Sequence, residues 1–130
     1  MATPGLLWLA VAALLAAGCS SDGCEARRYA QLRLLVVQTR SPHADAVNIA
    51  EVAFESAGDR VDCRAAAAHR GSSPPGMEAS TAFDGDLATA WLDFAARGAA
   101  LVAVCAGPVD AYRMALAAAP SDRDPVAWRL

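Results

Sequence analysis

The stretch STAFDGDLATAWLDF, Ser80 to Phe94, combines a turn signal with the start of an apolar segment. Asp84-Gly85-Asp86 is typical of a tight turn, because glycine adopts backbone conformations that other residues avoid and aspartate oxygens accept nearby N–H groups. Trp91, Leu92 and Phe94 follow at once. Trp91 alternates with Asp93, as core residues of a strand do, and burial of a tryptophan contributes roughly 2–3 kcal/mol or more. These side chains are therefore predicted to lie in the core, and the alternative is an exposed aromatic platform on which a sugar could stack. The stretch therefore predicts a turn followed by a core strand.

Apolar runs elsewhere in the chain also predict strands. YAQLRLLVVQTRS (29–41) and AALVAVCAG (99–107) are short, rich in leucine or valine, and end at proline or glycine, as buried strands do. RGSSPPG (70–76) is predicted to be a loop, because two consecutive prolines exclude both helix and central strand.

Two segments are ambiguous on pattern alone. In ADAVNIAEVAFESA (44–57), Val47, Ala50 and Phe54 fall at helical spacing, whereas Val47, Ile49 and Ala53 fit an alternating strand face. YRMALAAA (112–119) is rich in residues that favour helix. The pattern by itself therefore predicts a mixed or all-β domain.

Composition limits the classes of function. A chain of 130 residues with 55% hydrophobic and 19% charged residues is typical of one globular domain. The net charge of −3 gives no electrostatic argument for nucleic acid or an anionic membrane. The common nucleophile, zinc-protease, phosphate-loop and dinucleotide motifs are absent, and Asp84 and Asp86 on one turn are a poor pair for glycoside hydrolysis. The sequence predicts a protein that is not an enzyme.

The N-terminus predicts export. Residues 1–18 carry no charged side chain, and their apolar run is too short for comfortable spanning of a membrane. Ala16 and Gly18 are small residues before Cys19, which predicts a signal peptide at 1–18, a polar linker at 19–28 and a domain at 29–130. The alternatives are a buried hydrophobic helix and a retained membrane anchor. AAGCSS (16–21) also resembles a bacterial lipoprotein cleavage box, so the alternative to a secreted protein is a lipid anchor on Cys19.

The cysteines leave the disulfide pattern open. An oxidising compartment permits bridges, and Cys19, Cys24, Cys63 and Cys105 allow three complete pairings. None has the spacing of a zinc site. Cys105 lies in an apolar run, where a buried thiol and a bridge are both consistent with the sequence.

Five stretches in order carry a family resemblance: YAQLRLLVVQTRS, VNIAEVAFESAGDRV, SSPPGMEASTAFDGDLATAWLDF, ALVAVCAGPVDAYRMALA and RDPVAWRL. Together they resemble a discoidin, or coagulation factor 5/8 type C, domain of the galactose-binding-like superfamily. The resemblance implies an all-β antiparallel β-sandwich of jelly-roll type, with strands at Val47–Phe54 and Tyr112–Ala118. Because the family continues beyond the position of Leu130, closing strands are expected to be missing.

The resemblance also implies a metal site. In relatives that bind Ca²⁺, the corresponding loop uses the carboxylate of Asp84, carbonyls near Thr81 and Asp86, and the position of Thr89, often with a glutamate near the C-terminus of the domain. The alternative is a turn in which the carboxylates only cap backbone N–H groups.

Other polar residues are assigned to structure. Trp128 is predicted to be core, Arg123 and Asp124 a local ion pair, and Asp93 a partner of Arg113 or Arg123. His43 and His69 are predicted in exposed loops. The resemblance implies a secreted, non-catalytic module that binds carbohydrate or another cell-surface ligand, with ligand-binding residues unassigned. The alternative is a structural domain or truncated fragment without a ligand.

Overall fold

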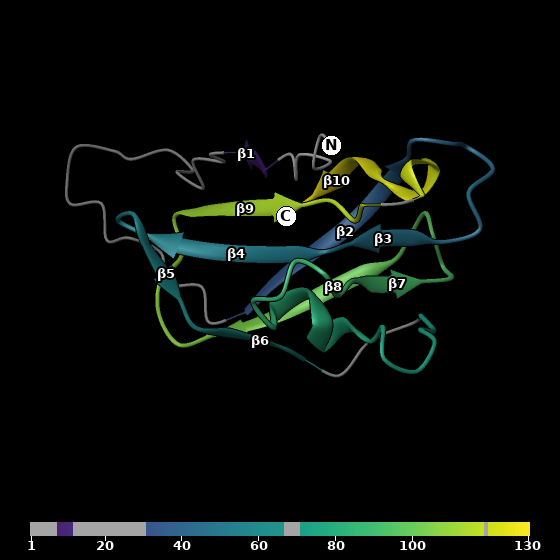
Figure 1. Ribbon diagram of the computed structural model, residues 1–130. Helices are drawn as coiled ribbons and strands as arrows, with labels where there is room; N and C mark the ends of the chain where they lie inside the picture. Colours follow the sequence, from purple (N-terminus) through teal and green to yellow (C-terminus); the bar gives the residue numbers. More distant parts are fainter. Residues whose placement is uncertain (1–7, 12–30, 67–70, 119) are drawn as a thin grey trace, which may run out of the picture.

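The protein is an all-β domain, which confirms the predicted fold class. The computed structural model describes residues 8–11, 31–66, 71–118 and 120–130 (Figure 1). These residues form strands and two short 3-10 helices, η1 (Ala79–Phe83) and η2 (Ser121–Arg123). The strands are β1 (Trp8–Val11), β2 (Gln31–Thr39), β3 (Val47–Ile49), β4 (Glu51–Ser56), β5 (Asp59–Val61), β6 (Cys63–Ala65), β7 (Trp91–Asp93), β8 (Ala100–Cys105), β9 (Ala111–Ala115) and β10 (Pro125–Arg129).

The strands form antiparallel sheets that enclose one core. One sheet has the order β1-β9-β4-β5, a second has the order β10-β2-β8-β6, and β3 pairs with β7. Alternate residues of both larger sheets point inward, which gives the core Leu32, Leu34, Val36, Val52, Phe54, Leu101, Ala103, Tyr112 and Met114. The arrangement is consistent with the predicted β-sandwich; the finer jelly-roll order stays a prediction.

Trp128 joins the two larger sheets. Its Nε1–H on β10 donates to the Tyr112 hydroxyl on β9 at 2.8 Å, and its ring packs against the core. The prediction that Trp128 belongs to the core is confirmed only in part, because the side chain is partly buried against the core with its one polar atom paired to Tyr112.

The ambiguous segment 44–57 is not one continuous strand, as Val47–Phe54 was expected to be. It breaks at Ala50, whose N–H donates to the Ala115 carbonyl at 2.9 Å. Val47 and Ile49 enter the core before the break, and Val52 and Phe54 enter it afterwards. The break shifts the inward phase by one residue, so β3 can pair with β7 and β4 with β9.

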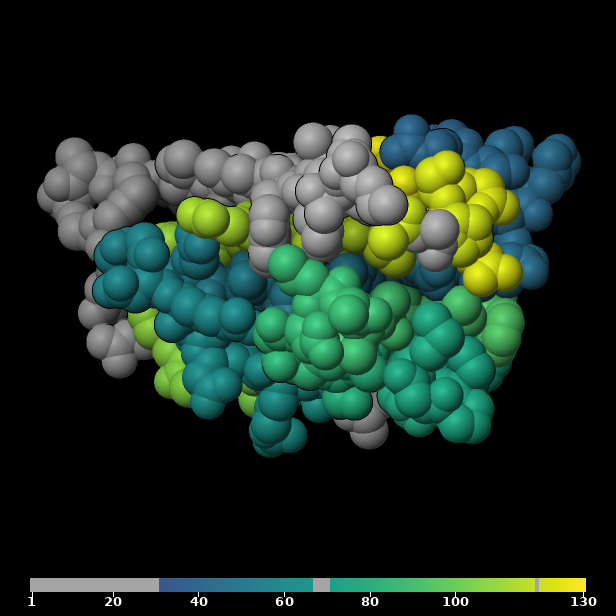
Figure 2. Space-filling model, viewed as in Figure 1, coloured from purple at the N-terminus to yellow at the C-terminus, as the bar shows by residue number. Residues whose placement is uncertain are grey.

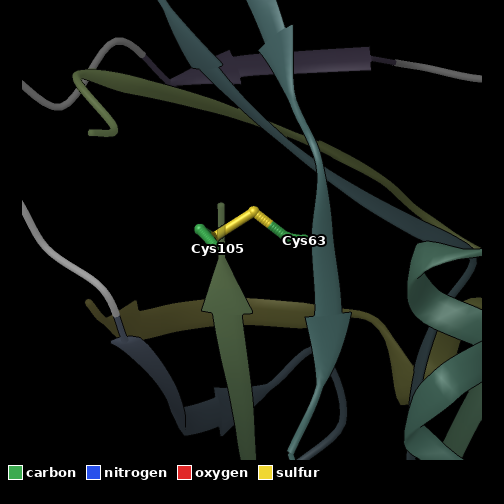
Figure 3. The surroundings of a disulfide bond; sticks show 2 residues. All are labelled: Cys63 and Cys105. Carbon is green, nitrogen blue, oxygen red and sulfur yellow. A yellow bond between two sulfur atoms is a disulfide. The ribbon is translucent and has the colours of Figure 1, made fainter. Parts of the chain in front are cut away.

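One disulfide joins β6 to β8. Cys63 and Cys105 lie directly opposite in the register, with 4.1 Å between their Cα atoms (Figure 3). The adjacent hydrogen bond from Ala106 N–H to the Asp62 carbonyl, 2.9 Å, is the pattern of a non-hydrogen-bonded pair, in which side chains approach closely. Cys105 therefore forms a bridge, and the pairing of Cys19 and Cys24 lies outside the described residues.

Part of the predicted signal peptide is described. Trp8–Val11 form β1, an edge strand that pairs with β9, while the rest of 1–18 and the linker 19–28 lie outside the described residues. No helix in the described ranges is long and apolar enough to cross a membrane. Cleavage after Gly18 would leave β9 as the edge of its sheet.

Candidate functional site

The Asp84-Gly85-Asp86 turn is closed by its own side chains. Gly85 has a φ of +75°, a backbone conformation that favours glycine. Asp84 Oδ1 accepts the Asp86 N–H at 2.8 Å, and Asp86 Oδ1 accepts the Ala88 N–H at 2.8 Å. These are the local aspartate turns that the sequence allowed as one of two alternatives.

Thr89 belongs to the turn, whereas Thr81 has a different role. The Thr89 hydroxyl hydrogen-bonds Asp84 Oδ2 and also reaches the Asp86 carbonyl at 3.0 Å. The Thr81 hydroxyl instead donates to the Glu78 carbonyl at 2.6 Å, at the start of η1. The fold thus brings Asp84, Asp86 and Thr89 together, and among the described residues no hydrogen bond links Thr81 to them.

Glu51 is a participant that sequence reasoning missed. It lies at the start of β4 with its side chain only 1% exposed. Both carboxylate oxygens accept the Gly85 N–H at 3.2 Å, and Oε1 also pairs with Arg60 at 2.9 Å. The signal in the sequence is a carboxylate inside the apolar run IAEVAF, where an unpaired charge would be costly. Glu51 therefore fixes the turn to β4 and β5.

The electrostatics of the two carboxylates differ. Burial raises the pKa of Glu51, although Arg60 and the Gly85 N–H stabilise its charged form and oppose the shift. Burial also acts to raise the pKa of Asp84, but hydrogen bonds from Thr89 and from backbone N–H groups outweigh it and hold this pKa below its ordinary range. Asp84 is thus the carboxylate that stays charged in mildly acidic solution.

These contacts account for the turn without a metal. Calcium takes six to eight oxygen ligands, and here the Asp84 oxygens already accept protein donors while Arg60 places a cation beside Glu51. The described residues contain no group of three or more metal-ligating side chains. Bound calcium would replace hydrogen-bond donors around Asp84, Asp86 and Thr89 and fix the turn. Calcium ligation by Thr81, Asp84, Asp86 and Thr89 stays a prediction, tested below.

A second candidate region lies where β2 ends. Pro125 of β10 pairs with Thr39 on one side of β2, and the Gly98 N–H donates to the Val36 carbonyl at 2.8 Å on the other. Asp93 pairs with Val47, which follows the loop after β2. Three segments therefore converge, and we call them the loop end: residues 40–46, 94–99 and 120–124. Figure 2 shows the segment that contains residues 40–46, in blue, beside the C-terminal segment, in yellow.

Two ion pairs brace the loop end. Arg123 Nε lies 3.0 Å from Asp45 Oδ1, and Arg40 Nη2 lies 3.2 Å from Asp124 Oδ2. The predicted local pair between Arg123 and Asp124 is therefore wrong, because each residue reaches across to the 40–46 loop. Burial raises the pKa of Asp124, and Arg40 partly opposes that shift.

Asp93 also has a different role from the predicted one. Its side chain is buried, and Oδ1 accepts the Ala95 N–H at 2.8 Å. Neither proposed arginine pairs with it, since Arg113 binds Glu55 at 2.8 Å and Arg123 binds Asp45. A Cβ at Gly71 would overlap the Asp93 carboxylate, so a larger residue there would displace this side chain at the end of β7.

Phe94 corrects the prediction that all three apolar residues after the turn are core. Trp91 and Leu92 are buried, at 1% and 5% exposure, but Phe94 is 51% exposed. β7 ends at Asp93, and the cap on Ala95 turns the chain there, while the Phe94 N–H donates to the Ser72 carbonyl at 3.0 Å. The phenylalanine ring therefore leaves the strand and stands on the loop end.

The histidines give less information. His43 lies exposed in the 40–46 loop, as predicted. His69 lies outside the described residues. Comparison of the chain with protein-family models, with curated proteins and with solved structures gives no match. The discoidin resemblance therefore stays a prediction, and a functional argument depends on the loop end itself.

Proposed function

We propose that this chain is a secreted, non-catalytic binding module of discoidin type, which takes a carbohydrate or another cell-surface ligand at the loop end. The observation that supports the proposal is the half-exposed ring of Phe94 on a braced loop, when Trp91, three residues earlier, is fully buried. A half-exposed aromatic side chain beside polar residues offers an apolar surface on which a ligand can pack.

The chemistry of the loop end suits a sugar. The apolar face of a pyranose ring stacks on an aromatic ring, and its hydroxyl groups accept and donate hydrogen bonds at the edge. Arg97 is exposed in the same turn as Phe94, and His43 is exposed on the neighbouring loop. Both side chains supply polar atoms next to an apolar ring.

The bracing of the loops favours binding. Backbone hydrogen bonds join Arg40 N–H to the Asp124 carbonyl at 2.8 Å and Ser41 N–H to the Asp122 carbonyl at 3.0 Å, in addition to the two ion pairs. Loops that are ordered before the ligand arrives lose less conformational entropy when it binds. The alternative, a structural domain without a ligand, treats Phe94 as one isolated exposed apolar residue, which is common on protein surfaces.

A glycan array probed with the full chain tests the proposal. We expect binding to one class of glycan, a loss of about tenfold or more in affinity for Phe94→Ala, and retention in Phe94→Trp. Val126→Ala is the matched control, since Val126 is another exposed apolar residue, at 43% exposure, outside the loop end. An array without binding, or equal affinity in Phe94→Ala, would favour the structural alternative.

Secretion has its own test. The Cys63–Cys105 bridge is compatible with an oxidising compartment. In a secreting host, mass spectrometry of the exported protein should find a chain that starts at Cys19, with 130 − 18 = 112 residues. A chain that keeps residues 1–18 would contradict the signal peptide, and a lipid mass on Cys19 would identify the anchored alternative.

A further inference from the structure

The outward face of the β10-β2-β8-β6 sheet carries a row of arginines. On β2, Leu32 and Leu34 point into the core, so Arg33 points outward. The register places Arg129 of β10 and Arg64 of β6 on the same outward face, and all three arginines are exposed. We call Arg33, Arg64 and Arg129 the arginine row.

The row crosses the sheet diagonally. Arg129 pairs with Leu35, two residues beyond Arg33, while Arg64 pairs with Val104, which itself pairs with Gln31. From strand spacing and rise per residue, neighbouring Cα atoms of the row are about 8 Å and about 12 Å apart. Arginine side chains are long, so the row can present its three charges along one line over such intervals.

Charges on this face differ from those on the opposite sheet. On the outward side of the β4-β5-β9 strands, Arg60 pairs with Glu51 and Arg113 pairs with Glu55. Within the described residues, no ion pair is found for any member of the arginine row. The outward strand positions around it hold Gln31, Leu35, Val37, Ala100, Val102 and Val104, without a carboxylate. Asp62, immediately before β6, is the nearest acidic residue in sequence to the row.

We propose that the arginine row binds a linear acidic polysaccharide, whose carboxylate or sulfate groups pair with successive guanidinium groups. Arginine donates two parallel hydrogen bonds that match the oxygens of these anions. The chain as a whole has a net charge of −3, so attraction of a polyanion must come from a local patch such as this one. The site is separate from Phe94 and the loop end, and it extends beyond the function proposed above.

The shape of the face favours a linear polymer over a membrane. Val102 and Ala100, between the arginines, are only 7% and 5% exposed, and Val37 on the same face is 42% exposed. One exposed valine among the described residues of this face gives little apolar area for insertion into lipid. A peptide that added a strand would bind the backbone groups of the edge strands β10 or β6, whereas the arginine side chains project from the face of the sheet. The arginine row therefore matches a linear polymer that carries anionic groups at intervals along its length.

Affinity measurements on immobilised polymers test the site. The full chain is passed over alginate, which carries only carboxylates, over heparin, which also carries sulfates, and over neutral dextran. We expect binding to at least one acidic polymer, weakening with salt, and none to dextran. Replacement of the row by Arg33→Gln, Arg64→Gln and Arg129→Gln together should weaken it about tenfold or more.

Two matched variants make the test specific. Arg113→Gln removes one positive charge from the opposite sheet and should leave binding within about twofold, whereas Asp62→Asn should strengthen it, because it removes a negative charge two residues from Arg64. Phe94→Ala should retain polymer binding, which separates this site from the loop end. Binding unchanged in the triple variant, no binding of the wild type, or binding only to phosphatidylserine vesicles would each overturn the proposal.

Discussion

Glu51 and Gly85 are joined across a separation of 34 residues, because both carboxylate oxygens of Glu51 lie 3.2 Å from the Gly85 N–H. Arg60 binds the same carboxylate from the neighbouring strand. The tight turn that marks the sequence is thus held by a buried acid on β4, and the β4-β5 hairpin and the turn form one unit.

Replacement of Glu51 should destabilise the domain. Glu51→Ala leaves the Gly85 N–H and the Arg60 guanidinium without their partner, so the free energy of unfolding should fall by about 1–3 kcal/mol. Urea unfolding measures it. Glu55→Ala is the control, since the Glu55 side chain is 17% exposed whereas that of Glu51 is 1% exposed; the Glu55–Arg113 pair should contribute less than about 1 kcal/mol. Equal losses in the two variants would contradict the special role of Glu51.

Glu51 and Asp84 should contribute to the free energy of unfolding with opposite dependences on pH. The pKa of Glu51 is raised above its ordinary value of 4.5, so the folded state holds that proton longer than the unfolded state. The unfolding free energy of the wild type, relative to Glu51→Gln, should therefore fall as the pH rises from about 4.5 through the raised pKa.

The pKa of Asp84 is lowered from its ordinary value of 3.8, and the sign is reversed. Relative to Asp84→Asn, the wild type should lose stability as the pH falls through 3.8 towards the lowered pKa. Urea unfolding at a series of pH values measures both differences. Variant and wild-type curves that stay parallel across these windows would contradict the assigned environments.

The strands could be predicted where apolar runs are long and end in turn residues. β2 and β8 lie inside the predicted runs, and the described part of the predicted loop 70–76, residues 71–76, is a loop, as its two prolines require. The phase change at Ala50 could not be predicted, because it is set by which strands β3 and β4 pair with. A one-residue shift of that kind leaves no mark in an alanine-rich sequence.

In the candidate site, too, features set by local residue types could be predicted, and features set by distant partners could not. The turn at Gly85 follows from local residue types, and its carboxylates cap backbone N–H groups two residues away. Glu51 and the exposure of Phe94 depend on distant partners, the first on Gly85 and Arg60, the second on where β7 stops. The ion pairs of Arg123 and Asp124 likewise cross to another loop, which adjacency in sequence conceals.

The hairpin between β4 and β5 contains a position, Ala57, at which a substitution should stabilise the domain. Ala57 has a φ of +51° and Gly58 a φ of +86°, as in a turn with two left-handed residues. Alanine is strained there by about 1–2 kcal/mol, whereas asparagine tolerates the conformation. Ala57→Asn should therefore raise the free energy of unfolding by about 1 kcal/mol. Ala106→Asn, at an exposed position without positive φ, should give no gain; equal gains would mean that the turn is unstrained.

If calcium binds at the Asp84-Gly85-Asp86 turn, the free energy of unfolding should rise when calcium is added. A metal that binds only the folded state raises the unfolding free energy by about 2.7 kcal/mol at a hundredfold excess over its Kd. Thermal unfolding of the protein with Ca²⁺ and with chelator measures this increment. Asp84→Ala should abolish the increment and also lose about 1 kcal/mol without metal, since the turn loses its caps.

The control for this experiment is Asp62→Ala, which removes an exposed carboxylate before β6 and should keep the full calcium increment. Mg²⁺ in place of Ca²⁺ should stabilise less, because it requires a tighter octahedral shell than a flexible turn supplies. A midpoint that is the same with Ca²⁺ and with chelator in the wild type would contradict the metal site. The hydrogen bonds of Asp84, Asp86 and Thr89 would then be the whole role of the turn, and Glu51 its anchor in the fold.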